Sequence, residues 1–219
     1  WRDYAQTAIA AVVRPERMAA QTAWERFTDE GPLALLPFDT ATGAHCALVW
    51  TVRSARADAL LAADDDAFLA ELGRRFGGRM GRFLSVAARE AYPLALRYRK
   101  SCVVAPGVVA IGNAAQTLHP VAGQGLNLGL RDAFELAAAI RAVAPERIGD
   151  AAMLAAFDRE RRLDRVASIS VTDGLVRVFG ASLPGAALAR GLGLAALDAL
   201  PAARRIFARR MMLGLRGVP

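Results

Sequence analysis

The first fifty residues alternate short apolar runs with turn residues, a pattern typical of β-strands. Strand-like runs cover residues 7–13, 21–25, 33–38 and 46–52. Arg14-Pro15 separates the first two runs, and Asp39 to Gly43 supplies turn residues before the last one. We therefore predict a sheet in this part of the chain, with a hairpin over residues 33–52.

From residue 57 the apolar positions follow a helical spacing instead. One face of this segment would carry the apolar side chains Leu60, Leu61, Phe68, Leu69, Leu72 and Phe76. The acidic run from Asp64 to Asp66 is expected to cap the second of two helices, and Gly77 is expected to end it. Tyr92-Pro93-Leu94 then predicts the start of a return strand.

Helical patterns dominate the rest of the chain. A long helix is predicted over residues 126–143, with an apolar face of Leu128, Phe134, Leu136 and Ile140. A second is predicted over 152–178, with an apolar face of Leu154, Phe157, Val166 and Ile169. Its charge run at 158–162 is most simply a solvated face. Residues 180–185 should break this helix.

The last segment, residues 188–215, is a basic amphipathic pattern that contains the pairs Arg204-Arg205 and Arg209-Arg210. Two interpretations stay open for it. It could pack as a tail on a neighbouring domain, or it could rest on a surface of anionic lipid.

The segment AIGNAAQTLHPVAGQGLNLGLRD, residues 110–132, carries the strongest functional signal. An apolar run leads into Gly112-Asn113, and a nearly uncharged loop reaches Gly123-Gln124-Gly125 at the start of the predicted helix. Glycines let the backbone approach a ligand closely. An uncapped helix start presents free N–H donors and the positive end of the helix dipole. The loop therefore suits a flat, electron-rich or anionic group.

This loop does not fit the dinucleotide-binding fingerprint. It runs Gly123-x-Gly125-x-x-x-Gly129 and lies a dozen residues past the strand, whereas the fingerprint follows its strand directly. Nothing in residues 1–100 fits the fingerprint either. A pyrophosphate-binding loop is therefore not expected within this sequence.

The 110–132 segment closely resembles the second flavin-binding motif of class A FAD-dependent aromatic hydroxylases. It is most similar to the ubiquinone-biosynthesis branch, the 2-polyprenyl-6-methoxyphenol hydroxylases. In the wider family the motif begins Gly-Asp, and the Asp holds the ribityl chain of FAD. Gly112-Asn113 occupies that place here, which would make the contact neutral. The resemblance covers the C-terminal part of a family member and opens at Tyr4-Ala5-Gln6-Thr7-Ala8.

The resemblance implies an α+β or α/β fold, in which a mixed-sheet substrate domain joins the C-terminal part of a Rossmann-like FAD-binding domain with a helical tail. We place the substrate-binding sheet at residues 1–100, the flavin-binding segment at 101–150 and the helical region at 151–219. The N-terminal half, with the Gly-x-Gly-x-x-Gly loop, would have to be supplied in cis or in trans.

The implied reaction uses FAD as cofactor, NAD(P)H as electron donor and dioxygen to hydroxylate a prenylated phenol. The resemblance leaves a different ring or a soluble aromatic substrate open. Gly112 and Asn113 would hold the ribityl chain. Pro120 and the turn through Ala122 and Gly123 would wall the flavin face where oxygen reacts.

The first turn of the helix would hold the flavin ring. The backbone N–H groups of Leu126 and Asn127 would face its pyrimidine edge, Gln124 could contact the ring edge, and Gly125 would allow close approach. Asp132 matches the family pattern, and both a surface or capping role and a flavin contact stay open for it.

His119 is the one titratable side chain of the loop. It could be a general base that deprotonates the phenol, since histidine titrates near neutrality. The alternative is a hydrogen bond that stabilises the loop.

Composition and residue spacing argue against several classes of binding partner. The net charge is +7, supplied mainly by arginine, but no aromatic residues interleave with a basic stripe, so nucleic acid is not expected. Two histidines and two cysteines without ligand spacing argue against a metal site, and Cys46 and Cys102 are interpreted as buried thiols. No apolar stretch reaches the length of a membrane span. We expect a cytoplasmic protein with peripheral contact to the inner membrane and to other ubiquinone-biosynthesis proteins.

A second hypothesis comes from a different functional class. Without the pyrophosphate-binding half, this chain could be a non-catalytic fragment that binds lipid or a partner. That hypothesis predicts salt-sensitive binding to liposomes that survives mutation of Gly125.

Overall fold

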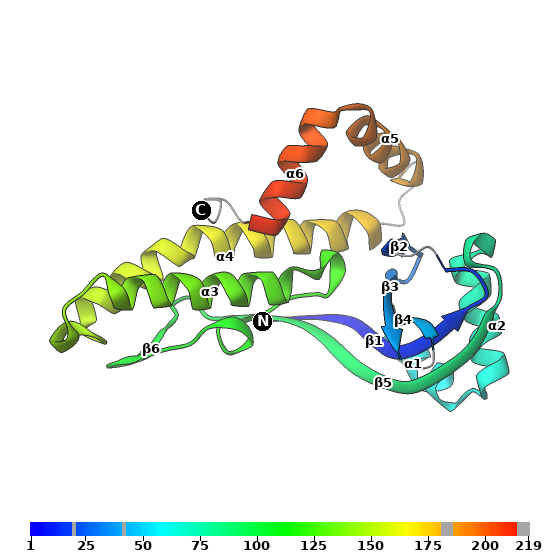
Figure 1. The fold of residues 1–219 in the computed structure, drawn as a ribbon, viewed down its shortest axis with the longest axis horizontal. Coiled ribbons are helices and arrows are strands. Elements are labelled where there is room, and N and C mark those ends of the chain that lie inside the picture. The colour runs from blue at the N-terminus through cyan, green and yellow to red at the C-terminus, as the bar shows by residue number, and fades with distance from the viewer. Residues whose placement is uncertain (19–20, 41–42, 181–185, 214–219) are drawn as a thin grey trace. The chain divides into compact units, whose positions relative to one another are not determined.

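The computed structural model describes residues 1–18, 21–40, 43–180 and 186–213, and the chain divides into two compact units (Figure 1). The sheet unit is Asp3–Leu94. The helical unit is Trp1–Arg2 together with Ala95–Pro219. In sequence, the sheet unit is thus an insertion within the helical unit.

Five strands make up the sheet of the sheet unit, in the order β2-β3-β4-β1-β5. Their bounds are β1 (Arg2–Pro15), β2 (Trp24–Phe27), β3 (Pro32–Thr40), β4 (Gly43–Arg53) and β5 (Phe83–Tyr98). The pairs β1–β4, β2–β3 and β3–β4 are antiparallel. Trp50 in β4 stands opposite Ile9 in β1 and Leu33 in β3, and all three side chains are buried.

Two helices cover this core, α1 (Ser54–Ala62) and α2 (Asp65–Phe76), followed by the short turn η1 (Gly78–Met80). The buried face of α2 consists of Phe68, Leu72 and Phe76. The Phe68 ring packs edge-on against the Trp50 ring, with 5.7 Å between the ring centroids. The Asp64 side chain accepts a hydrogen bond from the Ala67 amide at 2.7 Å, and Gly77 ends the helix at φ +84°. Both predictions for the ends of this helix are confirmed.

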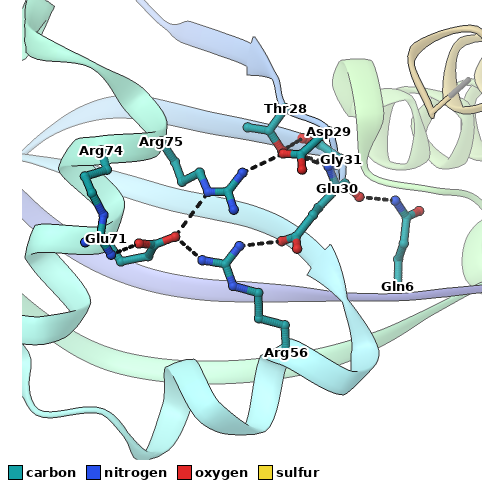
Figure 2. A network of polar contacts seen from close by, with 9 residues as sticks. All are labelled: Gln6, Thr28, Asp29, Glu30, Gly31, Arg56, Glu71, Arg74 and Arg75. Atoms are coloured by element: carbon teal, nitrogen blue, oxygen red, sulfur yellow. Dashed lines mark hydrogen bonds and ion pairs between the residues drawn. The ribbon is translucent and has the colours of Figure 1, made fainter. Parts of the chain in front are cut away.

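A charged network ties α1 and α2 to the loop before β3 (Figure 2). Glu71 accepts hydrogen bonds from Arg56, Arg74 and Arg75. Arg56 also reaches Glu30 at 2.9 Å, and Arg75 reaches Asp29 at 2.5 Å. Partial burial works to raise the pKa of Glu71, but the arginine hydrogen bonds outweigh it and lower that pKa to about 2. Glu71 therefore stays ionised and holds three arginines in place.

The helical unit begins with short strands and turns. The end of β5 pairs with β8 (Gln116–Thr117), and β6 (Val103–Ala105) pairs with β7 (Val108–Val109). Single turns follow as η2 (Gly112–Ala114), η3 (Val121–Gly123) and η4 (Pro145–Arg147). A small core of Cys102, Ala110, Ala115 and Phe157 joins these pieces to the helices.

Four helices complete the unit: α3 (Gln124–Arg141), α4 (Ala151–Gly180), α5 (Ala186–Ala199) and α6 (Pro201–Leu213). α3 lies along α4, and α6 contacts α3 (Figure 1). The predicted segment 188–215 divides at Leu200, where Pro201 opens a new helix. No helix among the described residues is both long and apolar enough to cross a membrane.

The predicted α+β character is confirmed, but several details of the prediction were wrong. The return strand begins at Phe83, nine residues before Tyr92, and the long helix begins at Gln124 rather than Leu126. The predicted break at 180–185 lies, apart from Gly180, outside the described residues. Both predicted thiols, Cys46 and Cys102, are buried and free.

The predicted buried faces of α3 and α4 were wrong in part. Phe134 and Ile140 are exposed, and the buried face of α3 consists of Gln124, Leu128, Arg131 and Asp132. On α4, Val166 is exposed, whereas Arg161 from the charge run is buried. These charged residues are buried because charges of opposite sign on the two helices pair with each other. A pattern of hydrophobic positions does not predict such pairs.

Candidate functional site

The glycine-rich loop between β7 and α3 is pressed closely against α3. Gly112 adopts φ +54°, a conformation that favours glycine. A Cβ atom added at Gly129, on α3, would lie 3.3 Å from the Gly112 Cα. The strand end and the helix therefore approach each other at a point where both residues lack side chains.

The start of α3 has no side-chain cap among the described residues. Gly123 is the N-cap at φ +61°, in the left-handed region, and its own amide donates to the Pro120 carbonyl at 2.9 Å. A helix leaves its first-turn amides without partners inside the helix. Because α3 begins at Gln124 rather than at Leu126, these include the amides of Gly125 and Leu126, whereas the prediction gave this role to Leu126 and Asn127. The positive end of the helix dipole lies behind them.

The space beside the glycines of this helix start is open. A Cβ atom added at Gly123 or Gly125 would meet no described atom within 4 Å. The side chain of Leu126 is 73% exposed. The backbone of this turn can thus be approached by a flat group from outside the unit.

A buried carboxylate, Asp132, holds the loop from behind. Its Oδ2 atom accepts from the Gly112 amide at 3.1 Å and from Gln116 Nε2 at 2.8 Å. Its Oδ1 atom accepts from Arg161 Nε, on α4, at 2.9 Å. Asp132 is fully buried, and it joins the loop, α3 and α4 at one point.

The network continues along α4. Arg161 also contacts Asp164 at 2.7 Å, and Asp164 is held at 2.9 Å by Arg131 of α3. Burial works to raise the pKa of Asp164, but Arg161 and Arg131 outweigh it and hold that pKa below its usual value. We name Asp132, Arg161, Asp164 and Arg131 the α3–α4 charge cluster.

Sequence reasoning missed most of this cluster. Asp132 was singled out without a settled role, and Arg161 was assigned to a solvated face. The alternation of arginine and aspartate along residues 158–165 was the available signal, because opposite charges three residues apart lie on one side of a helix.

His119 is buried within the loop, and only 1% of its surface is exposed. Its Nδ1 atom accepts a hydrogen bond from the Val121 amide at 3.1 Å. Burial lowers the pKa of His119 to about 4, so the ring is neutral near pH 7. With Nδ1 as acceptor, the proton of the neutral ring lies on Nε2.

The remaining predicted residues lie along the same loop and the first turn of α3. Asn113 is exposed, Pro120 and Asn127 are half-buried, and Gln124 is buried. Ala122 lies in η3, and the structure describes its backbone alone. The predicted site residues are thus brought together on one short stretch of backbone.

Comparisons with known proteins show which family the chain resembles. A family model described as an FAD binding domain matches residues 5–170. Ubiquinone hydroxylase UbiL of Rhodospirillum rubrum is 40% identical over 99% of this chain and 52% of its own length. The 3-demethoxyubiquinol 3-hydroxylase of Escherichia coli is 33% identical over 90% of this chain and 49% of its own length. The chain therefore spans about half the length of these curated relatives.

A solved structure extends the likeness to the fold. Klebsiella pneumoniae HpxO, complexed with FAD and uric acid, superposes with a TM-score of 0.66. The match covers 100% of this chain and 55% of that one, at 18% sequence identity. At this identity the likeness concerns the fold alone.

Proposed function

This chain belongs to the FAD-binding-domain family, and on that basis we propose that it is the C-terminal part of an FAD-dependent monooxygenase of ubiquinone biosynthesis. Its substrate would be a polyprenylated phenol, and NAD(P)H would be the electron donor. The single observation that carries the proposal is the uncapped start of α3, with open space beside Gly123 and Gly125.

The loop suits a flavin on physical grounds. A flat ring can lie against a backbone without side chains, and the amides of Gly125 and Leu126 would donate to the ring's oxygen- and nitrogen-rich edge. The dipole of α3 would favour negative charge on that edge. When bound, FAD would supply the oxygen chemistry, and the protein would supply position and a dry environment.

The surrounding residues divide the remaining tasks. Gly112 and exposed Asn113 would hold the ribityl chain, and Pro120 and Ala122 would wall the reactive face. Gln124 would contact the ring edge from the start of the helix, beside Asn127. The α3–α4 charge cluster would fix the loop in the shape that the flavin requires, since Asp132 binds the Gly112 amide directly.

We assign His119 to holding the loop. The pKa of His119 is about 4, so its ring is neutral at pH 7 but holds a proton only weakly. It would therefore be a poor general base for a phenol. The bond from the Val121 amide to Nδ1 instead fixes the turn that leads into η3.

A complete FAD site would need a pyrophosphate-binding half. The relatives are about twice as long as the matched region, and a βαβ unit with Gly-x-Gly-x-x-Gly would supply the missing contacts. We propose that such a unit acts with this chain in cis or in trans.

The first test is a flavin titration of the purified chain, alone and with an N-terminal half of a relative, followed by FAD fluorescence and visible absorption. Gly125→Val should abolish flavin binding without loss of stability, because its side chain would enter the open space that the ring requires. Gly174→Val is the matched control, since a Cβ at this α4 position also meets no described atom within 4 Å. A Gly125→Val protein that still binds FAD would overturn the placement of the ring.

The alternative hypothesis, a non-catalytic lipid- or partner-binding fragment, is favoured by one observation. Ile206 and Phe207 on α6 are exposed beside Arg204, Arg205 and Arg209. In that case the chain would bind anionic vesicles, and Gly125→Val would leave this binding unchanged.

A further inference from the structure

A pocket of about 550 Å³ lies within the helical unit, between α4 and the α5–α6 pair. Its wall is mainly aliphatic, aromatic and thioether: Ala167, Val171, Leu197, Ala203, Ile206, Phe207 and Met211. Its volume falls in the range of sites that hold small molecules, about 300–1,000 Å³. We name it the α4–α6 pocket.

The polar residues of the pocket are already engaged by the protein. Asp164 is bound by Arg161 and Arg131, and Ser168 Oγ accepts from Arg131 Nη2 at 3.3 Å. The carboxylate is thus paired with two arginines of the protein. A ligand in this pocket would meet mostly hydrocarbon, so an apolar ligand without charge suits it.

The pocket also adjoins the proposed flavin loop. Gln124 lines the pocket and is the first residue of α3, directly between Gly123 and Gly125. A molecule with a polar ring at the loop could therefore place an attached chain in the pocket. A long hydrocarbon chain on an aromatic head has this division into two parts.

The rim of the pocket is apolar as well. Ile206 is 59% exposed and Phe207 43% exposed, although both line the pocket. Exposed apolar side chains around an open cavity are typical of ligand-binding grooves and of surfaces that a membrane or another protein covers. Flexible Met211 would adapt to a chain with methyl branches.

We propose that the α4–α6 pocket binds the isoprenoid tail of the substrate. This inference rests on the proposed function for its ring-bearing substrate, but the pocket itself requires no flavin. The tail would pass Gln124 and lie between α4 and α6, while the phenol ring would lie next to the flavin that Gly125 admits. The pocket would thereby favour prenylated phenols over short ones.

The test measures tail binding without flavin. Radiolabelled geranylgeraniol, an isoprenoid chain without a phenol, is equilibrated with the purified chain by dialysis. Wild type should bind it saturably, and palmitate should compete at least about tenfold less well. Ala203→Trp should fill the pocket and weaken binding about tenfold or more, since its indole occupies the space of the chain. Ala202→Trp, at an exposed neighbouring position of α6, should bind as wild type does.

Thermal melts of each variant distinguish a filled pocket from a misfolded chain. If Ala203→Trp does not fold, the smaller Ala203→Leu replaces it, with Ala202→Leu as control. Absent saturable binding, equal competition by palmitate, or unchanged binding in a folded Ala203 variant would overturn the inference. The flavin titration of Gly125→Val is independent of these results, so failure of the tail site and failure of the proposed function are distinguishable.

Discussion

At the scale of single residues, the position of His119 shows how burial decides chemistry. The ring is enclosed in the loop, and its Nδ1 atom accepts from the Val121 amide. A protonated ring could not accept that bond and would be charged in a dry environment. The burial that weakens His119 as a base also links its protonation to the folding of the loop.

His119 should make the stability of the chain depend on pH. Its pKa is about 4 in the folded chain, against an ordinary value of 6.5, so the unfolded chain binds the proton first as pH falls. Stability should be complete above pH 6.5 and decline by about 2 to 3 kcal/mol toward pH 4. Urea denaturation between about pH 8 and pH 4.5 should show this decline in wild type and a flatter profile in His119→Gln.

The other histidine provides the control for this measurement. His45→Gln, in β4, should keep the slope of wild type. If His119→Gln keeps the same slope over the acidic half of that range, the buried neutral ring is not its source.

At the scale of elements, the positions of helices and strands could be predicted from the sequence better than the side chains that each helix buries. The ends of α2 followed from Asp64 and Gly77, because capping residues act locally. The buried side of α3 did not follow, because Arg131 and Asp132 are buried through partners on α4. The hydrophobic periodicity of one helix does not show which of its charged residues pair with another helix.

The candidate site shows the same division. The glycines and the uncapped helix start could be recognised from the sequence, since they are consecutive residues. The role of Asp132 could not, because its partners Gly112, Gln116 and Arg161 lie 16 to 29 positions away. Folding brings these groups together through the packing of α3 on α4.

Asp132→Asn should loosen the contact between the loop, α3 and α4. The substitution leaves buried Arg161 with one carboxylate instead of two, and we expect a loss of about 3 kcal/mol in the free energy of unfolding. Chemical denaturation measures this loss. Flavin affinity of the complemented chain should fall in parallel, because the Gly112 amide loses a charged acceptor.

A matched substitution at an exposed ion pair separates the effect of burial from the effect of losing a charge. Asp198→Asn removes a carboxylate from the exposed pair with Arg204 and should cost less than about 1 kcal/mol. Equal effects of the two substitutions would contradict the importance given to the α3–α4 charge cluster.

At the scale of the whole molecule, a net charge of +7 makes contact with anionic surfaces favourable. Arg204, Arg205 and Arg209 on α6 concentrate part of that charge beside exposed Ile206 and Phe207. If prenylated substrates enter through the α4–α6 pocket, this is also the surface that would meet the membrane in which they dissolve.

We predict that the chain binds phosphatidylglycerol vesicles at low salt and releases them at high salt. Replacing Arg204, Arg205 and Arg209 by glutamine lowers the net charge from +7 to +4 (7 − 3 = 4) and should weaken binding at least about tenfold, at roughly 1 kcal/mol per residue. Vesicle co-sedimentation measures both effects.

A control with the same net charge tests position rather than total charge. Glutamine at exposed Arg14, Arg159 and Arg162 should leave most of the binding intact. Equal losses in the two triple variants would show that α6 has no special part in membrane contact.

The insertion of the sheet unit between Arg2 and Ala95 has a consequence for engineering and for evolution. The chain passes into and out of that unit along β1 and β5, which are neighbours in one sheet. A protein organised in this way can exchange residues 3–94 for the corresponding segment of a relative as a single cassette, with only two junctions to match. The glycine-rich loop, the charge cluster and the α4–α6 pocket would all stay behind in the recipient, so chimaeras of this kind would separate what the sheet contributes to substrate choice from what the helices contribute.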